Sequence, residues 1–138
     1  MEAALRPRVL CVDDNRDATD SAVELLRIVG FDALGCYDGP HALAVASQFD
    51  PHVYLLDLNM PGMDGDELAA QLREQACGKV ILFVAVTACG DEESRRRTAA
   101  AGFEMHLVKP VDPHDLIHVV DALWQIHQRE VAESSRRR

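Results

Sequence analysis

Long apolar runs are absent from this chain of 138 residues. No stretch approaches the roughly 18 consecutive apolar residues that a membrane-spanning helix needs, and the N-terminus lacks the apolar core of a signal peptide. Aromatic residues make up only 5% of the sequence although 48% of it is hydrophobic, so its core must be mostly aliphatic. We therefore expect a cytoplasmic protein without a membrane partner, built as one domain that is long enough to bury a core of its own.

Paired cysteine motifs are missing as well. The 4 cysteines form no C-x-x-C pair and have no histidine at zinc-binding spacing, which argues against a structural zinc site. They stand at Cys11, Cys36, Cys77 and Cys89. Three of them fall in or beside predicted strands, so we expect buried, reduced thiols.

Positive charge is scarce. The chain has 14 Lys and Arg against 23 Asp and Glu, which gives a net charge of −9. Four of the arginines lie within residues 129–138, which we expect to form a short, basic and disordered tail. The body before this tail is therefore more acidic than the whole chain. Its charge argues against nucleic acid as a partner, because a phosphate backbone requires a basic surface.

Short apolar runs alternate five times with helical patterns. Runs of this length, rich in Val, Ile and Leu, are typical of buried parallel strands. Repeated strand–helix units imply right-handed crossovers and a single doubly wound α/β sheet. The strands are expected at residues 8–12, 32–37, 53–57, 80–86 and 105–108. The helices are expected at about residues 17–29, 40–49, 66–75 and 91–101, and from residue 113 onward.

Polar residues stand at the ends of four of these strands. Asp13 and Asp14 follow the first strand, Asp57 ends the third, and Thr87 and Lys109 follow the fourth and fifth. Because parallel strands all point the same way, these side chains should gather at one edge of the sheet, where open α/β sheets bind their ligands. Three carboxylates, a hydroxyl and an ammonium in one crevice predict a site for a phosphoryl group and a divalent metal.

The carboxylates carry the metal prediction. At a separation of ~4 Å and an effective dielectric constant near 20, each pair among Asp13, Asp14 and Asp57 would repel by roughly 4 kcal/mol. A bare site would therefore hold a proton or a cation, and hard oxygen ligands of this kind suit Mg²⁺. Asp57 emerges from a buried strand, and an Asp so placed can also act as a nucleophile and form an acyl phosphate.

Lys109 and Thr87 complete the predicted phosphoryl site. Lys109 offers a point charge to phosphoryl oxygens, and Thr87 offers a hydroxyl donor. Pro110 follows Lys109 directly, which makes the Lys109–Pro110 peptide bond a candidate for the cis form.

Taken together, these motifs resemble the receiver domain of two-component response regulators. The resemblance covers residues 8–127 and is carried by Asp13-Asp14, Leu55-Leu56-Asp57 with Met60-Pro61-Gly62-Met63-Asp64-Gly65, Thr87-Ala88 and Lys109-Pro110. It implies a receiver domain within residues 1–128. It also implies the flavodoxin-like fold, a five-stranded parallel sheet with strand order 2-1-3-4-5.

The same resemblance implies a signalling function. A histidine kinase or a histidine phosphotransfer protein would donate a phosphoryl group from phosphohistidine to Asp57. Thr87 and Lys109 would hold that group, and the domain would change conformation and signal to a downstream protein. It would catalyse only its own phosphorylation and dephosphorylation, so we do not expect an enzyme in the usual sense.

A metal-binding arrangement is implied too. In the family pattern, Asp14, Asp57 and the backbone carbonyl of Asn59 would bind Mg²⁺ directly. Asp13 would bind the ion through a water molecule.

One residue departs from the family pattern. The family usually places Tyr or Phe three residues before the lysine of the fifth strand, as a rotamer switch coupled to the residue at Thr87. Here that position holds His106. His106 is either a smaller, polar switch whose charge responds to pH or an inert surface histidine.

Two other functions stay open at this point. A phosphatase of the haloacid dehalogenase type also uses a phosphoaspartate, but it needs a second Asp two residues after the nucleophile, where this chain has Asn59. A pseudo-receiver would bind partners without accepting phosphate, although every site residue is present. The chain could also be a free single-domain regulator, a phosphorelay shuttle or the receiver of a hybrid kinase. Met1 and the short arginine tail favour a free protein, whereas Val111-Asp112-Pro113 after Lys109-Pro110 resembles the receivers of hybrid kinases.

Overall fold

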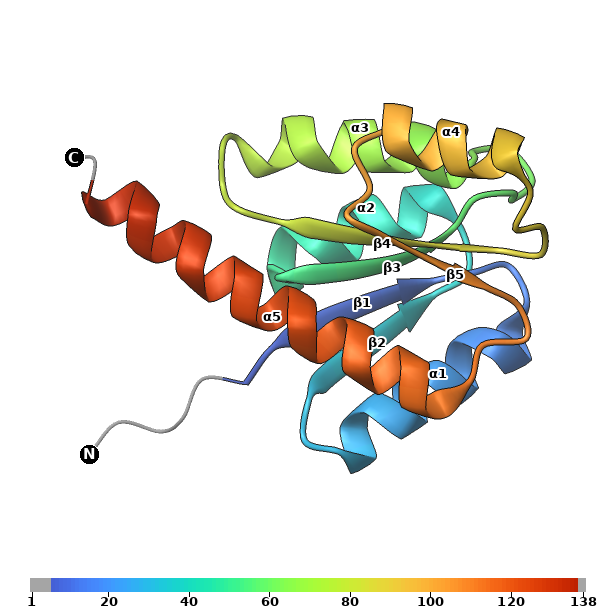
Figure 1. Cartoon of the computed structure of the whole chain (residues 1–138), viewed down its shortest axis with the longest axis horizontal. Coiled ribbons are helices and arrows are strands. Elements are labelled where there is room, and N and C mark those ends of the chain that lie inside the picture. The colour runs from blue at the N-terminus through green and yellow to red at the C-terminus, as the bar shows by residue number, and fades with distance from the viewer. Residues whose placement is uncertain (1–5, 137–138) are drawn as a thin grey trace.

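A parallel sheet with helices on both faces makes up the protein in the computed structural model, which describes residues 6–136 (Figure 1). The strands pair in the order β2-β1-β3-β4-β5, which confirms the flavodoxin-like order. They are β1 (Arg8–Val12), β2 (Asp32–Cys36), β3 (Val53–Asp57), β4 (Leu82–Thr87) and β5 (Met105–Val108). The helices are α1 (Arg16–Ile28), α2 (Gly39–Phe49), α3 (Gly65–Ala76), α4 (Glu92–Ala100) and α5 (Pro113–Arg136).

Side-chain caps fix where several of the helices begin. Asn15, Asp38 and Asp91 precede α1, α2 and α4, and a side-chain oxygen of each accepts a hydrogen bond from the backbone N–H three residues later. Such a cap satisfies an N–H group that has no partner within the helix and typically stabilises it by ~1 kcal/mol. Pro40 lies in the first turn of α2, where its missing N–H breaks no hydrogen bond.

The two faces of the sheet bury separate apolar cores. Helices α1 and α5 cover one face, and α2, α3 and α4 lie on the other (Figure 1). Along β1 the side chains alternate between them, with Val9 and Cys11 in the first core and Leu10 and Val12 in the second. Because both faces of the central strands are covered, polar groups of β1 and β3 can meet solvent only at the strand ends. This architecture places any ligand site at an edge of the sheet.

Helix α5 is longer than the sequence indicated. Residues 129–136 continue it as far as Arg136, so the expected disordered tail is helical up to that residue. Residues 137–138 of that tail lie outside the described part of the chain. The segment contains neither Gly nor Pro, and Arg129 and Glu133 are four residues apart, a spacing at which opposite charges support a helix. Within residues 6–136, no helix has the length and apolar character needed to cross a membrane.

Candidate functional site

Lys109 lies between two buried carboxylates at the carboxyl edge of the sheet. Its Nζ is 2.7 Å from Oδ2 of Asp13 and 3.6 Å from Oδ2 of Asp57. The three residues follow or end β1, β3 and β5, and the parallel arrangement of these strands brings them together. Both carboxylates are buried and the lysine is half-buried, so water screens these charges only weakly.

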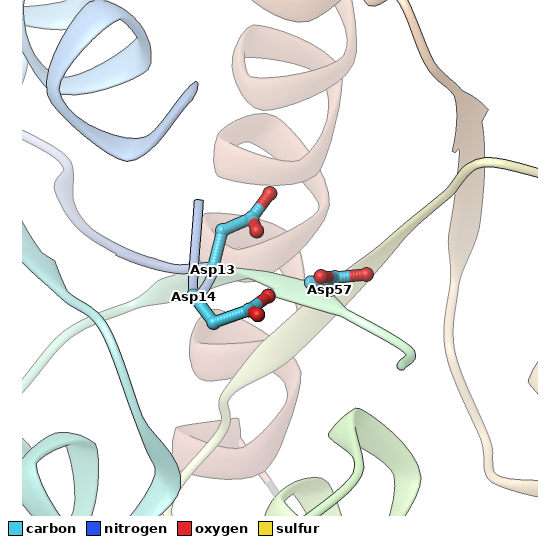
Figure 2. A group of neighbouring side chains, drawn as sticks. All are labelled: Asp13, Asp14 and Asp57. Carbon is cyan, nitrogen blue, oxygen red and sulfur yellow. The ribbon is translucent and has the colours of Figure 1, made fainter. Parts of the chain in front are cut away.

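An acidic cluster forms at the same edge. One carboxylate oxygen from each of Asp13, Asp14 and Asp57 lies within 4.8 Å of the other two. Figure 2 shows the Asp13 and Asp14 side chains, which follow β1, next to Asp57 at the end of β3. Asp14 is exposed, so the cluster can be reached from solvent. A set of hard oxygen donors open to water fits Mg²⁺, which binds few carboxylates and keeps several water ligands.

Backbone hydrogen bonds hold the two buried carboxylates in place. The N–H of Asn15 donates to Oδ1 of Asp13 (3.0 Å), and the N–H of Asn59 donates to Oδ1 of Asp57 (3.2 Å). Each carboxylate thus has Oδ1 fixed by the backbone two residues later, and its Oδ2 is the oxygen nearer to Lys109. As a result, Oδ1 of Asp57 is held by the backbone and Oδ2 faces Lys109.

The close charges perturb the ionisation of the site. Burial and the Asp13 carboxylate raise the pKa of Asp57 to about 7, and Lys109 acts in the opposite direction. Burial alone would lower the pKa of Lys109, but its hydrogen bond to Asp13 and the charges of both carboxylates outweigh this and raise it. The lysine is therefore a permanent cation. A divalent cation in the cluster would favour the ionised form of Asp57 for the same electrostatic reason.

Thr87 is completely buried (0% exposed) at the end of β4. Its Oγ1 accepts a hydrogen bond from the N–H of Cys89 (3.3 Å), and a hydroxyl that accepts in this way can still donate its proton. The Thr87 carbonyl accepts the N–H of Lys109 (2.8 Å), which joins the end of β4 to the residue after β5. The Lys109–Pro110 bond is cis, as the sequence suggested.

His106 lies in β5, paired with Ala85 of β4, and its ring is half-buried rather than solvated. Among residues 6–136, Nε2 of this ring is a buried nitrogen without a hydrogen-bond partner. Such a group costs free energy, so a turn of the ring that gave Nε2 a partner would be favoured.

We expect the His106 ring to respond when Asp57 is occupied. Beryllofluoride, a phosphoryl mimic, should draw the Thr87 hydroxyl toward Asp57 and open space into which the ring turns. In a histidine-selective NMR spectrum, the ring protons of His106 should therefore shift on addition of beryllofluoride and Mg²⁺. The exposed His118 of α5 is an internal control whose resonances should stay in place. Unchanged His106 resonances would identify it as a bystander.

Gly65 begins α3 directly against the end of β3. Its N–H donates to the Leu58 carbonyl (3.0 Å). A Cβ at this position would lie only 2.3 Å from the backbone oxygen of Asp57. The absence of a side chain therefore lets the loop after Asp57 fold back tightly.

Arg97 is a contact of this loop that sequence reasoning did not single out. It lies in α4, and its guanidinium donates hydrogen bonds to the Asn59 side chain and to the Leu58 carbonyl. In the sequence it is the last of three successive arginines, 95–97, a pattern typical of a solvated helix face. No local feature distinguishes it from its two neighbours.

Fold and site together define a flavodoxin-like α/β protein with an acidic, lysine-containing edge. The chain matches the family model of the response regulator receiver domain over residues 9–121. It therefore belongs to the response regulator receiver domain family.

The chain is also similar to curated proteins of different lengths. The chain is 33% identical over 120 residues to an uncharacterized 14.6 kDa protein of Leptolyngbya boryana, a match that covers 87% of this chain and 92% of the relative. It is 35% identical over 129 residues to the transcriptional regulatory protein PrrA of Mycobacterium tuberculosis. That match covers 94% of this chain but only 54% of PrrA, so the chain spans about half the length of this relative.

Solved structures show the same fold. The chemotaxis protein CheY4 of Vibrio cholerae superimposes with a TM-score of 0.81 at 28% identity, covering 86% of this chain and 99% of CheY4. A CheY-like receiver domain protein of Methanospirillum hungatei gives a TM-score of 0.82 at 25% identity, covering 91% of this chain and 99% of that protein.

Proposed function

We propose that this receiver domain accepts a phosphoryl group on Asp57 from the phosphohistidine of a histidine kinase or of a histidine phosphotransfer protein. The observation that carries the proposal is the placement of Lys109, whose Nζ lies 3.6 Å from Oδ2 of a buried Asp57 inside the acidic cluster. A carboxylate nucleophile beside a fixed cation matches the needs of phosphoryl transfer, which depends on positioning and on charge stabilisation. Phosphorylation of wild-type protein and of Asp57→Asn by a small phosphodonor tests it directly.

Phosphoryl transfer replaces the P–N bond of the donor with a P–O bond to Asp57. An oxygen of ionised Asp57 forms a bond to phosphorus while the P–N bond of phosphohistidine breaks. The electron pair of that bond stays on the imidazole nitrogen, which takes up a proton, and the product is an aspartyl acyl phosphate. Lys109 and the Thr87 hydroxyl then hold two phosphoryl oxygens by charge and by hydrogen bonding. Attack of water on phosphorus later breaks the P–O bond to Asp57, which releases inorganic phosphate and restores the free carboxylate.

The acidic cluster would hold Mg²⁺ during this chemistry. Asp14, Asp57 and the Asn59 carbonyl would bind the ion directly, and Asp13 would bind it through water. When bound, the ion neutralises charge on the phosphoryl oxygens. The Asp57 carboxylate attacks, and the backbone bond from Asn59 and the Lys109 ammonium orient it.

A protein is the downstream partner that we propose. The net charge of −9 supports a protein rather than a nucleic acid as the direct target. The change at Asp57 would reach the surface through Thr87 and His106 of neighbouring strands β4 and β5. We propose that phosphoryl transfer and signalling take place in the cytoplasm, where buried, reduced thiols such as Cys11 and Cys36 persist.

Mg²⁺ is expected to stabilise the fold, because it relieves the repulsion among the carboxylates. At ten times its dissociation constant, a ligand of the folded state alone stabilises by about 1.4 kcal/mol. Thermal melts should therefore shift upward with millimolar Mg²⁺, and Asp14→Ala should remove most of that rise. Asp17→Ala removes another exposed carboxylate three residues away and should leave the rise intact. An equal rise in wild type and Asp14→Ala would mean that the ion binds elsewhere.

A further inference from the structure

The guanidinium of Arg97 joins α4 to the loop that follows Asp57. Nη1 donates to Oδ1 of Asn59 (2.8 Å), and Nη2 donates to the carbonyl of Leu58 (3.0 Å). Nε and Nη2 also form a two-pronged pair with the carboxylate of Asp66, at 2.9 and 2.8 Å. Nη2 also lies 3.3 Å from Oδ2 of Asp64. One side chain thus contacts three residues of the loop and the first turn of α3.

These contacts fix the orientation of the Arg97 guanidinium. A guanidinium that bonds a carboxylate through two parallel N–H groups has a fixed orientation, and charge-assisted bonds of this kind are stronger than neutral ones. Both partners are half-buried, so the pair is less screened than a surface ion pair. The Leu58 carbonyl also accepts the N–H of Gly65, so Arg97 and the start of α3 hold the same peptide group.

We propose that Arg97 is a positioning residue that holds the loop of residues 58–64, and with it the Asn59 carbonyl, and ties this loop to α4. The inference rests on the proposed metal site, in which the Asn59 carbonyl is a ligand. Since Arg97 bonds the side chain of Asn59, the position of that carbonyl and the position of α4 are linked. Coupling is reciprocal, so an ion bound at Asn59 biases α4 just as α4 biases ion binding.

An NMR titration with Mg²⁺ alone tests this coupling. In wild-type protein, the ion should shift the amide resonances of Asp14 and Asn59 and also those of α4. In Arg97→Gln, the shifts at Asp14 should remain while those of α4 disappear, and the dissociation constant for Mg²⁺ should rise roughly 10-fold, as for residues that orient metal ligands. Arg97→Lys keeps the positive charge but cannot form the paired hydrogen bonds to Asp66, so it should also lose the α4 response. Arg96→Gln removes the same charge from an exposed neighbouring position and should behave as wild type.

Amide hydrogen exchange without metal provides a second measurement. The Gly65 N–H, bonded to the Leu58 carbonyl, should exchange roughly 10-fold faster in Arg97→Gln than in Arg96→Gln, because the loop opens more often. Persistent α4 shifts in Arg97→Gln, or an equal loss in Arg96→Gln, would overturn the coupling. If wild-type protein showed no shift at Asp14, the proposed metal site would fail. In that case the exchange rate of the Gly65 amide would be the remaining test of Arg97. Equal rates in Arg97→Gln and Arg96→Gln would refute a positioning role.

Discussion

Acetyl phosphate and Mg²⁺ are expected to add about 80 Da, one phosphoryl group, to the wild-type protein and nothing to Asp57→Asn. The physical reason is that Asp57 combines an oxygen facing Lys109 with a place in the acidic cluster. Asp13 also lies beside Lys109, at 2.7 Å, but that closer pairing occupies its oxygen in a charged hydrogen bond. Intact-protein mass spectrometry at neutral pH measures the adduct before the acyl phosphate hydrolyses.

Asp17→Asn is the matched control for this experiment. It makes the same chemical change at an exposed carboxylate of α1 and should label like wild type. Undiminished labelling of Asp57→Asn would transfer the acceptor role to another group. Sustained turnover of an added phosphate ester through Asp57 would instead support a phosphatase of the haloacid dehalogenase type. The amide Asn59, at the position where such an enzyme needs an acid–base carboxyl group, makes that outcome unexpected.

Much of the fold could be predicted because parallel strands leave simple traces in a sequence. The strands β1, β3 and β5 lie at residues 8–12, 53–57 and 105–108, where they were expected. Strand β5 at the sheet edge is less buried than expected, because Met105 and Val108 are exposed. In α1, by contrast, apolar character alone does not mark the buried face, because Thr19 is buried beside Val23 whereas Val29, directly after the helix, is 44% exposed. The cause lies in another strand, since Gly35 of β2 has no side chain and both Thr19 and Val23 fill the space that its Cβ would take. The spacing of apolar residues along a helix cannot reveal such a contact with a strand.

Some residues of the site could be predicted from the sequence and others could not. Strand-end carboxylates and the lysine could be placed at one edge from topology alone, because every parallel strand ends there. Arg97 could not, because a long flexible side chain reveals its partners only once α4 is packed beside α3. The helical end of α5 was missed for another reason, since its mixture of charged and small polar residues is equally typical of a solvated tail and of an exposed helix.

Two histidines form a ring cluster at the opposite, amino edge of the sheet. Nδ1 of His52 accepts the N–H of Arg8 (2.9 Å), and Nε2 of His127 bonds to the Val80 carbonyl (2.7 Å), for which it must be the donor. The two rings lie 4.8 Å apart, and Trp124 lies 4.7 Å from His52. Since Nδ1 of His52 is used as an acceptor, this ring is neutral in the folded protein, and protonating it would break the bond to Arg8.

This cluster is expected to make the fold sensitive to acid. Burial, and then the charges of Arg8 and His127, lower the pKa of His52 to about 4, and burial also lowers the pKa of His127. Groups with lowered pKa in the folded state bind protons preferentially when the chain is unfolded. Their contribution to the free energy of unfolding is therefore fully present above the histidine pKa of the unfolded chain, near 6.5, and is lost as the pH falls toward 4. Asp57 acts in the opposite direction, because its raised pKa destabilises the fold near neutral pH and this effect fades on acidification.

Urea unfolding in the Asp57→Asn background separates the two effects. Between pH 7 and pH 4.5 the free energy of unfolding should fall by about 2 kcal/mol, allowing for partial solvent exposure of the rings. His52→Asn keeps an acceptor for the Arg8 N–H and His127→Gln keeps a donor for Val80, yet neither side chain titrates, so together they should remove most of the fall. His118→Asn, at an exposed position of α5, should leave it unchanged. Carboxylates with lowered pKa, such as Asp66, lose their contribution only at still lower pH, below their unfolded value. A fall of the same size in the doubly substituted protein would therefore show that the acid sensitivity arises outside this cluster.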